Sequence, residues 1–276
     1  MNIEKEPDKS LLTKISSKYI LKLVFANLSR GSLLKLLKYN KYYQQIKGLK
    51  LQDYKEYAEI IELEIIPASN KLGKFINIPE DDKRYYHIFF NDEQEERNSE
   101  SINDEKEEDE EEDKEKEEEE EEKEKEKEKI KKIRITIDTE VVSFEKLFEE
   151  CKCIQSIYFK RFFRKNINNM RGMFWECESL QNINLDKFKT NEVTNMSWMF
   201  FGCKSLEKAD ISNFVFDNTE KIVGMFWGCK ALEEVKLPQF NKDNRIDMKC
   251  MFSECSEELK ENIQNGNYNL DNDAFE

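Results

Sequence analysis

The sequence predicts an α/β fold: a solenoid of short helices and parallel strands, preceded by a helical subdomain and a β-rich cap. Two observations carry this prediction. One apolar pattern recurs at a spacing of 26 residues between positions 144 and 255. Each copy joins a segment of helical period to a segment of period two, which indicates a helix followed by a strand. Such copies stack on one another to form a continuous core.

The clearest marker of the repeat is a Met-Phe pair with a cysteine four positions after the methionine. It occurs without any insertion at Met173, Met199, Met225 and Met251, and a weaker copy begins at Leu147. A fixed register over five copies is typical of stacked supersecondary units. One helix and one strand in 26 residues cannot bury their own apolar faces, so neighbouring copies must pack together, strand beside strand in a parallel sheet.

The third copy shows the two periods. Its apolar side chains stand at i, i+3, i+4 and i+7, the spacing of one face of a two-turn helix, at Met196, Met199, Phe200 and Cys203. Three residues after the cysteine, an alternating segment that starts with Leu206 predicts a short strand. A phenylalanine that we expect to fill the following turn also recurs every 26 residues, at Phe162, Phe188, Phe214 and Phe240.

The run NMSWMFFGCKSL at positions 195–206, with Ile211-Ser212-Asn213-Phe214 after it, resembles the BspA-like leucine-rich repeat family. The consensus of that family reads approximately NMSxMFxGCxSLxxLDLSNFDTSNVT. The resemblance covers residues 144–255 and implies a leucine-rich-repeat solenoid that binds other proteins and has no catalytic residues. Many family members are cell-surface proteins. The fourth copy departs from the consensus at positions 221–224, and the fifth lacks the strand pattern after Leu259.

Upstream of the repeats, residues 1–57 predict a helical subdomain. A first helix is expected from Ser10 to about Leu28, and Gly31 separates it from a leucine-rich second helix. The stretch 20–45 also resembles an F-box, the helical module that docks onto cullin-type ubiquitin ligases. The alternative is a plain helical cap or an unrelated interaction domain.

Residues 58–90 predict the β-rich cap, with strands at 60–66, 74–78 and 85–90. His87 lies in the third of these strands and is expected to be a half-buried packing residue. The segment 130–137 is predicted to be the first strand of the solenoid, with the cap strands covering its open end. Beyond the repeats, residues 256–276 predict an N-capped helix that closes the last unit, followed by a frayed tail; the alternative for the tail is that Phe275 tucks back.

The charge of the chain is concentrated in one stretch. The formal net charge is −14, and residues 92–129 alone carry about −16, so the remainder is near neutral. We expect residues 91–129 to be a disordered acidic insertion, because they hold too few apolar side chains to repay ordering. The alternatives are a solvated helix with Glu and Lys pairs, or an attractant for a basic partner. No basic stripe elsewhere predicts nucleic-acid binding.

Several functional classes find no support in the sequence. No signal peptide or stretch of 18 uncharged apolar residues is evident, which predicts a cytoplasmic protein without membrane insertion. The seven cysteines are expected to be small buried groups and not disulfides or metal ligands, because five of them hold the repeat register. No phosphate-binding glycine loop or catalytic triad pattern is present. The chain is therefore predicted to be no enzyme and to need no cofactor or metal.

Two candidate protein-binding surfaces follow from the repeat register. The first consists of aromatic side chains next to the Met-Phe pairs, at Trp175, Trp198, Phe201 and Trp227. The alternative for these rings is packing between stacked units. The second consists of the outward-facing strand positions, at Tyr158, Asn182, Asn184, Lys208, Asp210 and Lys236. The predicted function is a non-enzymatic protein-protein interaction scaffold; the alternatives are an F-box-like substrate adaptor of a ubiquitin ligase and a surface adhesin.

Overall fold

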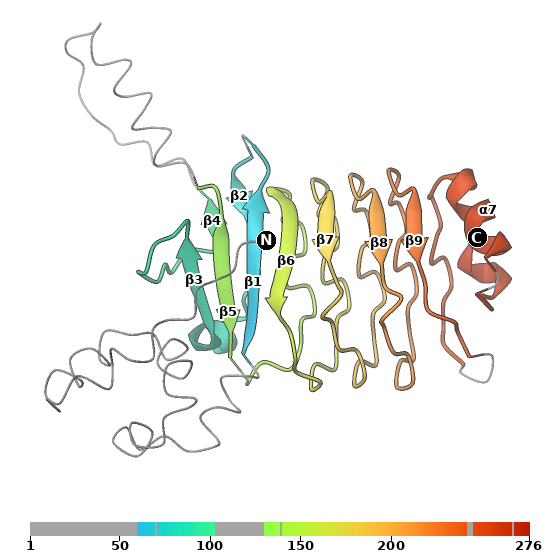
Figure 1. Ribbon diagram of the computed structural model, residues 1–276, viewed down its shortest axis with the longest axis horizontal. Coiled ribbons are helices and arrows are strands. Elements are labelled where there is room, and N and C mark those ends of the chain that lie inside the picture. Colours follow the sequence, from blue (N-terminus) through green and yellow to red (C-terminus); the bar gives the residue numbers. More distant parts are fainter. Residues whose placement is uncertain (1–59, 70, 103–129, 139, 242–244, 267) are drawn as a thin grey trace, which may run out of the picture. The chain divides into compact units, whose positions relative to one another are not determined.

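The computed structural model describes residues 60–276 except positions 70, 103–129, 139, 242–244 and 267 (Figure 1). The predicted helical subdomain with its F-box-like stretch lies outside the described residues, as does most of the predicted acidic insertion. Residues 91–102 of that insertion are placed next to the sheet, where Arg97 forms an isolated antiparallel bridge with Ile88.

The described part is built mainly from strands. Its main sheet has the order β3-β5-β1-β6-β7, formed by Tyr86–Phe90, Ile133–Ile137, Ile61–Pro67, Ile154–Arg161 and Asn182–Asn184. Two smaller sheets pair β2 with β4 and β8 with β9, formed by Gly73–Lys74, Ser101–Ile102, Lys208–Asp210 and Glu234–Lys236. The helices are α7 at Glu257–Asn265 and the short 3-10 helices η1 at Glu80–Tyr85 and η2 at Asn272–Ala274.

The first strands follow from simple alternation. In β1 the side chains of Ile61, Leu63 and Ile65 are fully buried, and Glu62 and Glu64 lie between them on the outer face. Strand β5 buries Ile133, Ile135 and Ile137 in the same way. The expected strands at 60–66 and 85–90 therefore correspond to β1 and β3, whereas of the strand expected at 74–78 only Lys74 pairs, as part of β2. β1 is a central strand because it pairs with β5 along one edge and with β6 along the other.

The position of β1 overturns part of the predicted topology. β1 runs antiparallel to both β5 and β6, so it separates the segment 130–137 from the repeats. Among the described strands, β6 with β7 and β8 with β9 are parallel, and isolated parallel bridges also join successive copies, from Ser143 to Asn169 and on to Asp247. Two of the strands predicted as a separate cap, β1 and β3, are thus integral members of a mixed sheet (Figure 1). Sequence periodicity does not report which strand lies beside which, and this is why the order was missed.

The helix predicted in each repeat is absent. Residues 144–241 are all described, and none of them is helical. The cause is a left-handed residue, with φ between 52° and 72°, at two positions of every copy, which interrupts any run of helical dihedrals. One position directly precedes the Met-Phe pair and is occupied by Lys146, Gly172, Trp198, Gly224 and Cys250. The other directly precedes the cysteine and is occupied by Glu150, Glu176, Gly202, Gly228 and Glu254.

Hydrogen bonds between copies replace the helical ones. In the third copy alternate N–H groups donate to carbonyl oxygens of the fourth copy over 2.8 to 2.9 Å, from Met196, Trp198, Phe200 and Gly202 to Lys221, Val223, Met225 and Trp227. Turn bonds such as Met199 N–H to the Met196 carbonyl close the segment within its own copy. The chain therefore satisfies its backbone in consecutive turns that are held side by side. The predicted α/β leucine-rich-repeat solenoid, with its helices and parallel sheet, is wrong.

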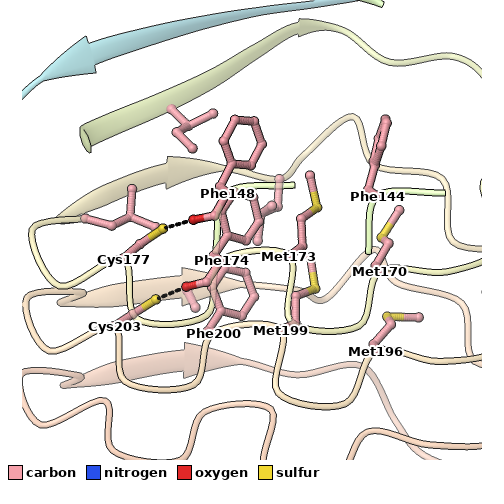
Figure 2. Packing of buried hydrophobic residues seen from close by; sticks show 14 of the residues in the cluster. Phe144, Phe148, Met170, Met173, Phe174, Cys177, Met196, Met199, Phe200 and Cys203 are labelled. Atoms are coloured by element: carbon pink, nitrogen blue, oxygen red, sulfur yellow. Dashed lines mark hydrogen bonds between the residues drawn. The ribbon is translucent and has the colours of Figure 1, made fainter. Parts of the chain in front are cut away.

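The core of the repeats is a stack of phenylalanine rings. Phe148, Phe174 and Phe200 are fully buried and lie nearly parallel, with ring centroids 5.4 and 5.2 Å apart (Figure 2). The stack continues through Phe226 to Phe252 at 5.3 and 5.6 Å. The predicted apolar face is therefore buried as expected, although turns and not helices present it.

The cysteines of the repeat have a specific role beside this stack. The thiol of Cys203 donates a hydrogen bond to the carbonyl oxygen of Phe174 at 3.1 Å, and Cys177 contacts Phe148 in the same way at 2.9 Å (Figure 2). Cys229 and Cys255 repeat the bond. Six of the seven cysteines are buried, which confirms the predicted burial for all of them but Cys250. Burial raises the pKa of the Cys203 thiol well above its ordinary value and keeps it a neutral donor.

Replacing Cys203 should test this role. We expect Cys203→Ala to lower the free energy of unfolding by about 1–2 kcal/mol, because a buried sulfur and its hydrogen bond are both lost. Cys203→Val, which restores the volume but not the donor, should recover only part of the loss. Urea unfolding measures both. Lys204→Ala is the exposed control, and a wild-type stability for Cys203→Val would show that the thiol bond contributes nothing.

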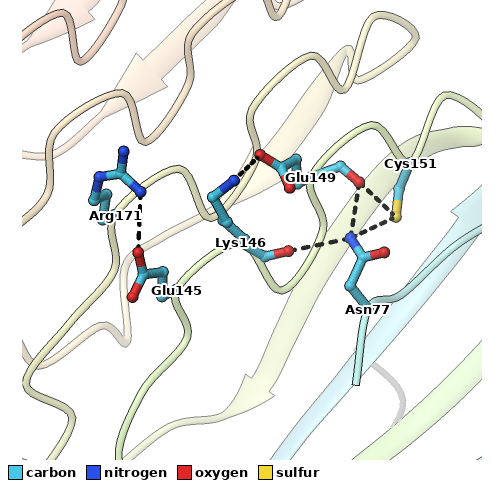
Figure 3. Close-up of polar contacts among 6 residues, drawn as sticks. All are labelled: Asn77, Glu145, Lys146, Glu149, Cys151 and Arg171. Carbon is cyan, nitrogen blue, oxygen red and sulfur yellow. Dashed lines mark hydrogen bonds and ion pairs between the residues drawn. The ribbon is translucent and has the colours of Figure 1, made fainter. Parts of the chain in front are cut away.

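The first repeat is capped by Asn77. Its backbone N–H donates to the Leu147 carbonyl at 2.7 Å, and its side-chain amide donates to the carbonyls of Glu149 and Lys146 at 2.8 and 3.1 Å (Figure 3). These carbonyl groups belong to the copy that has no preceding copy to bond with. Asn77 therefore provides the donors that an earlier repeat would supply.

The last repeat is closed by α7 and the tail. Ser256 caps α7 as predicted, since its hydroxyl accepts the N–H of Leu259. The tail is not frayed, and the alternative, that Phe275 tucks back, is confirmed. The N–H groups of Cys250 and Phe252 donate to Asp273 and Ala274, and Phe275 stacks on Phe252 at 5.7 Å. The tail thus occupies the place of a further copy.

Candidate protein-binding surface

The predicted aromatic residues come together on one surface. Phe201 directly follows the buried Phe200, and the left-handed Gly202 comes next, so Phe201 remains half-buried. Trp175 and Trp227 occupy the same position one copy before and one copy after. The ring centroid of Phe201 lies 4.4 Å from that of Trp175 and 5.7 Å from that of Trp227. We call Trp175, Trp198, Phe201 and Trp227 the aromatic surface.

Both interpretations of these rings, as exposed side chains and as packing between stacked copies, are partly correct. Each ring packs against its neighbours, yet all four side chains keep partial exposure. They are not core residues like the phenylalanine stack beneath them. The inter-copy hydrogen bonds fix their backbone, so the surface is ordered before any partner arrives. Whether it binds a protein stays a prediction.

Trp198 is the most constrained member of the aromatic surface. Its φ of 57° lies in the left-handed region, where a non-glycine residue is strained. Its indole lies across Gly224: a Cβ on that glycine would come within 2.7 and 2.9 Å of two indole atoms. On another side, the Arg171 guanidinium lies 4.6 Å from the Trp198 ring centroid. A strained tryptophan held by two neighbours indicates a defined ring position.

Sequence reasoning missed the polar partners of this surface. Arg171 pairs with Glu145 at 3.0 Å, and Lys146 pairs with Glu149 at 2.6 Å (Figure 3). Arg171 and Glu145 occupy the same position in successive copies, 26 residues apart, so the register contained a signal for their contact. Charged residues at this position do not recur throughout the repeat, however, and the pair did not stand out.

The second predicted surface is the outer face of the strands. Tyr158 is in register with Asn184, and Ser156 is in register with Asn182. In the other parallel pair, Lys208 bonds Glu234 at 3.1 Å and Asp210 bonds Lys236 at 3.2 Å. Lys160 lies over the Tyr158 ring and also pairs with Glu64. The structure aligns the predicted residues within each pair of strands, but it satisfies their charges internally, which leaves less for a partner.

His87 is half-buried, as expected, but it is more than a packing residue. Its Nδ1 lies 3.0 Å from Glu96 Oε1 and its Nε2 lies 3.3 Å from Asp138 Oδ2. Burial opposes protonation, but the hydrogen bonds to the two carboxylates outweigh it and raise the pKa of His87 above its ordinary value. The protonated ring can donate to both acids and so joins β3 to the segment 91–100 and to the end of β5.

This contact predicts a pH dependence of stability. Because the folded pKa of His87 is raised, its contribution is complete below the unfolded pKa of about 6.5 and is lost as pH rises through the folded pKa. Wild type should therefore exceed His87→Gln in stability at low pH, and the gap should shrink towards pH 8. Thermal unfolding of both proteins across this range measures it. A gap that does not change with pH would contradict the assignment.

Other kinds of site have little support in the described part of the chain. No group of three or more His, Cys, Asp or Glu side chains there could hold a metal ion. A cavity of about 790 Å³ lies between the last repeat and the tail, lined by residues that include Phe240, Met248, Ile263 and Tyr268. It contains none of the predicted site residues. Among the described helices, none combines the length and apolarity needed to cross a membrane.

The fold and the aromatic surface define a repeat protein with one ordered, partly exposed row of rings. A family model described as "Mycoplasma protein of unknown function, DUF285" matches residues 142–266, that is, the repeats and α7. Searches of the curated proteins and of the solved structures found no match. The family description gives no function, and the resemblance to the BspA-like family stays a prediction.

Proposed function

We propose that this protein is a non-enzymatic scaffold that binds other proteins through its aromatic surface. The observation that carries the proposal is the row of Trp175, Phe201 and Trp227, half-exposed and in mutual contact. Tryptophan is the residue type most enriched where interfaces concentrate their binding energy. Rings that are already ordered lose little conformational entropy when a partner covers them.

The proposed compartment is the cytoplasm. The thiol groups of Cys177, Cys203, Cys229 and Cys255 donate hydrogen bonds in the core, which requires reduced sulfur. A reducing environment maintains that state. For the F-box-like adaptor and the surface adhesin, no described residue provides specific support.

Capture of partners with matched variants tests the proposal. The full chain serves as bait in native lysate beside Trp175→Ala/Phe201→Ala/Trp227→Ala and a strand-face control, Asn182→Ala/Lys208→Ala/Lys236→Ala. A partner recovered by wild type and by the control should be lost with the ring variant. Measured with the purified partner, its affinity should fall at least about a hundredfold, because two or more hot-spot rings are removed.

Folding of the ring variant must be shown by its circular dichroism and melting temperature. A partner that is lost with the strand-face control but retained by the ring variant would transfer the contact to the strands. A partner that both variants retain would remove the aromatic surface from the proposal.

A further inference from the structure

The aromatic surface already holds one cation of its own. The Arg171 guanidinium lies against the Trp198 ring, 4.6 Å from its centroid, and its Nη1 lies 3.0 Å from Glu145 Oε1. The carboxylate comes from the first copy, the cation from the second and the ring from the third. The spacing of these copies therefore allows a cation to lie between a ring face and a carboxylate.

The other three rings of the surface receive no such cation from the described part of the chain. Among the described residues, no lysine or arginine lies over Trp175, Phe201 or Trp227; the cation-π contacts there involve Tyr85, Phe89, Tyr158 and Trp198. The faces of aromatic rings carry negative electrostatic potential, which attracts ammonium and guanidinium groups. Trp175 and Phe201 stack on each other at 4.4 Å and so cover one face of each ring, and no described cation lies on the faces that remain.

Two carboxylates accompany these open rings. The N–H of Glu150 donates to the Trp175 carbonyl, and the N–H of Glu176 donates to the Phe201 carbonyl, each at 2.7 Å. Nearby Glu145, Glu149 and Glu178 all pair with a lysine or arginine. Glu150 and Glu176 form no ion pair with another described residue. The backbones of Glu150 and Glu176 thus lie beside those of Trp175 and Phe201, and their carboxylates have no counter-ion in the described part of the chain.

The backbone beside the rings also leaves room. The next copies have Gly202 and Gly228 at the position of Glu150 and Glu176, and a Cβ added at Gly202 would lie 3.1 Å from Glu176 Cγ. The Glu176 side chain therefore crosses the bare glycine next to Phe201. At Gly228, by contrast, an added Cβ would meet only the backbone of Gly202, at 3.8 Å, so the strip is free of side chains there, whereas Glu176 occupies it at Gly202.

From these features we infer that the partner is a basic segment, which places a lysine or arginine side chain over the open rings and pairs it with Glu150 and Glu176. The inference rests on the proposed function and specifies the chemistry of its partner. Charge complementarity carries it, because the unpaired carboxylates favour a cation over an apolar or acidic segment, and the rings add a cation-π attraction to their apolar contact.

Intrinsic fluorescence gives a selective test, because Trp175, Trp198 and Trp227 are the only tryptophans of the chain. The probe is an octapeptide of alternating glycine and lysine, titrated into the full-length protein. The same peptide with acetylated lysines is the uncharged control. We expect a saturable fluorescence change with the first peptide and none with the second. Raising the salt concentration should weaken the binding.

Matched variants separate this surface from the acidic insertion, which also attracts basic peptides. Glu150→Gln/Glu176→Gln should weaken the fluorescence-detected affinity about tenfold, because two desolvated charge contacts are lost. Glu107→Gln/Glu110→Gln, which removes equal charge from the insertion, should change it less than about twofold. Equal affinities for the first variant and wild type, or a response to the acetylated peptide, would overturn the inference.

Failure of this inference differs from failure of the proposed function. If the captured partner is lost with the ring variant but binds equally well to Glu150→Gln/Glu176→Gln, the surface binds a protein and the basic segment is excluded. If the ring variant retains the partner, the proposed function fails as well.

Discussion

Phe200→Ala should lower the free energy of unfolding by about 3–5 kcal/mol, the range for truncating a fully buried aromatic side chain. Phe200 has no exposed surface, and its ring lies 5.2 Å from Phe174 and 5.3 Å from Phe226, nearly parallel to both. Hydrogen bonds to the fourth copy fix the backbone of the third, which hinders the neighbours from closing the cavity. Urea unfolding followed by circular dichroism measures the loss.

Two other phenylalanine variants serve as controls for the stability loss of Phe200→Ala. Phe200→Leu keeps most of the volume and should cost less than about 2 kcal/mol. Phe163→Ala, at a side chain that is 59% exposed, should change stability by less than about 1 kcal/mol. Equal losses for Phe200→Ala and Phe163→Ala would show that the phenylalanine stack is not the core of the repeats.

Gly224→Ala should lower the free energy of unfolding by about 2–4 kcal/mol. Its φ of 57° costs an L-residue roughly 1–2 kcal/mol. The remainder comes from the indole of Trp198, since the new Cβ would lie 2.7 Å from its nearest atom. The displaced ring should also change the tryptophan fluorescence of the folded protein. Chemical unfolding and emission spectra give both readouts.

A double-mutant cycle separates the two causes. In a Trp198→Ala background, Gly224→Ala should cost only the backbone share, about 1–2 kcal/mol, because the clash no longer exists. Strict additivity of the two substitutions would mean that the Trp198 ring does not lie against Gly224. The cycle therefore tests the geometry of the aromatic surface without any knowledge of its partner.

The helices were mispredicted because two backbones can share one apolar pattern. Spacing at i, i+3, i+4 and i+7 places side chains on one face of a helix, and consecutive four-residue turns do the same. Glycine at positions 172, 202, 224 and 228 was the available signal for left-handed residues. Lysine, tryptophan, cysteine and glutamate at the equivalent positions of other copies concealed it, since these residues rarely adopt positive φ.

The candidate site, too, could be predicted from the sequence only in part. The recurrence of Trp175, Phe201 and Trp227 in one position was enough to predict a row of rings. The contact of Trp198 with Gly224, and the cation that Arg171 places over Trp198, depend on side-chain directions that no linear pattern contains. That Glu150 and Glu176 have no ion-pair partner among the described residues likewise appears only once the neighbours of each charge are known.

The sequence by itself determined the repeat register, the buried phenylalanine and cysteine positions, and the strands β1, β3 and β5, because each follows from local periodicity and the burial of apolar side chains. Only the tertiary structure decided that β1 lies between β5 and β6, that turns replace helices, and that Asn77 and the tail close the two ends. These outcomes depend on which backbone groups find hydrogen-bond partners in distant segments. Such pairing is a property of the assembled chain and not of any single repeat.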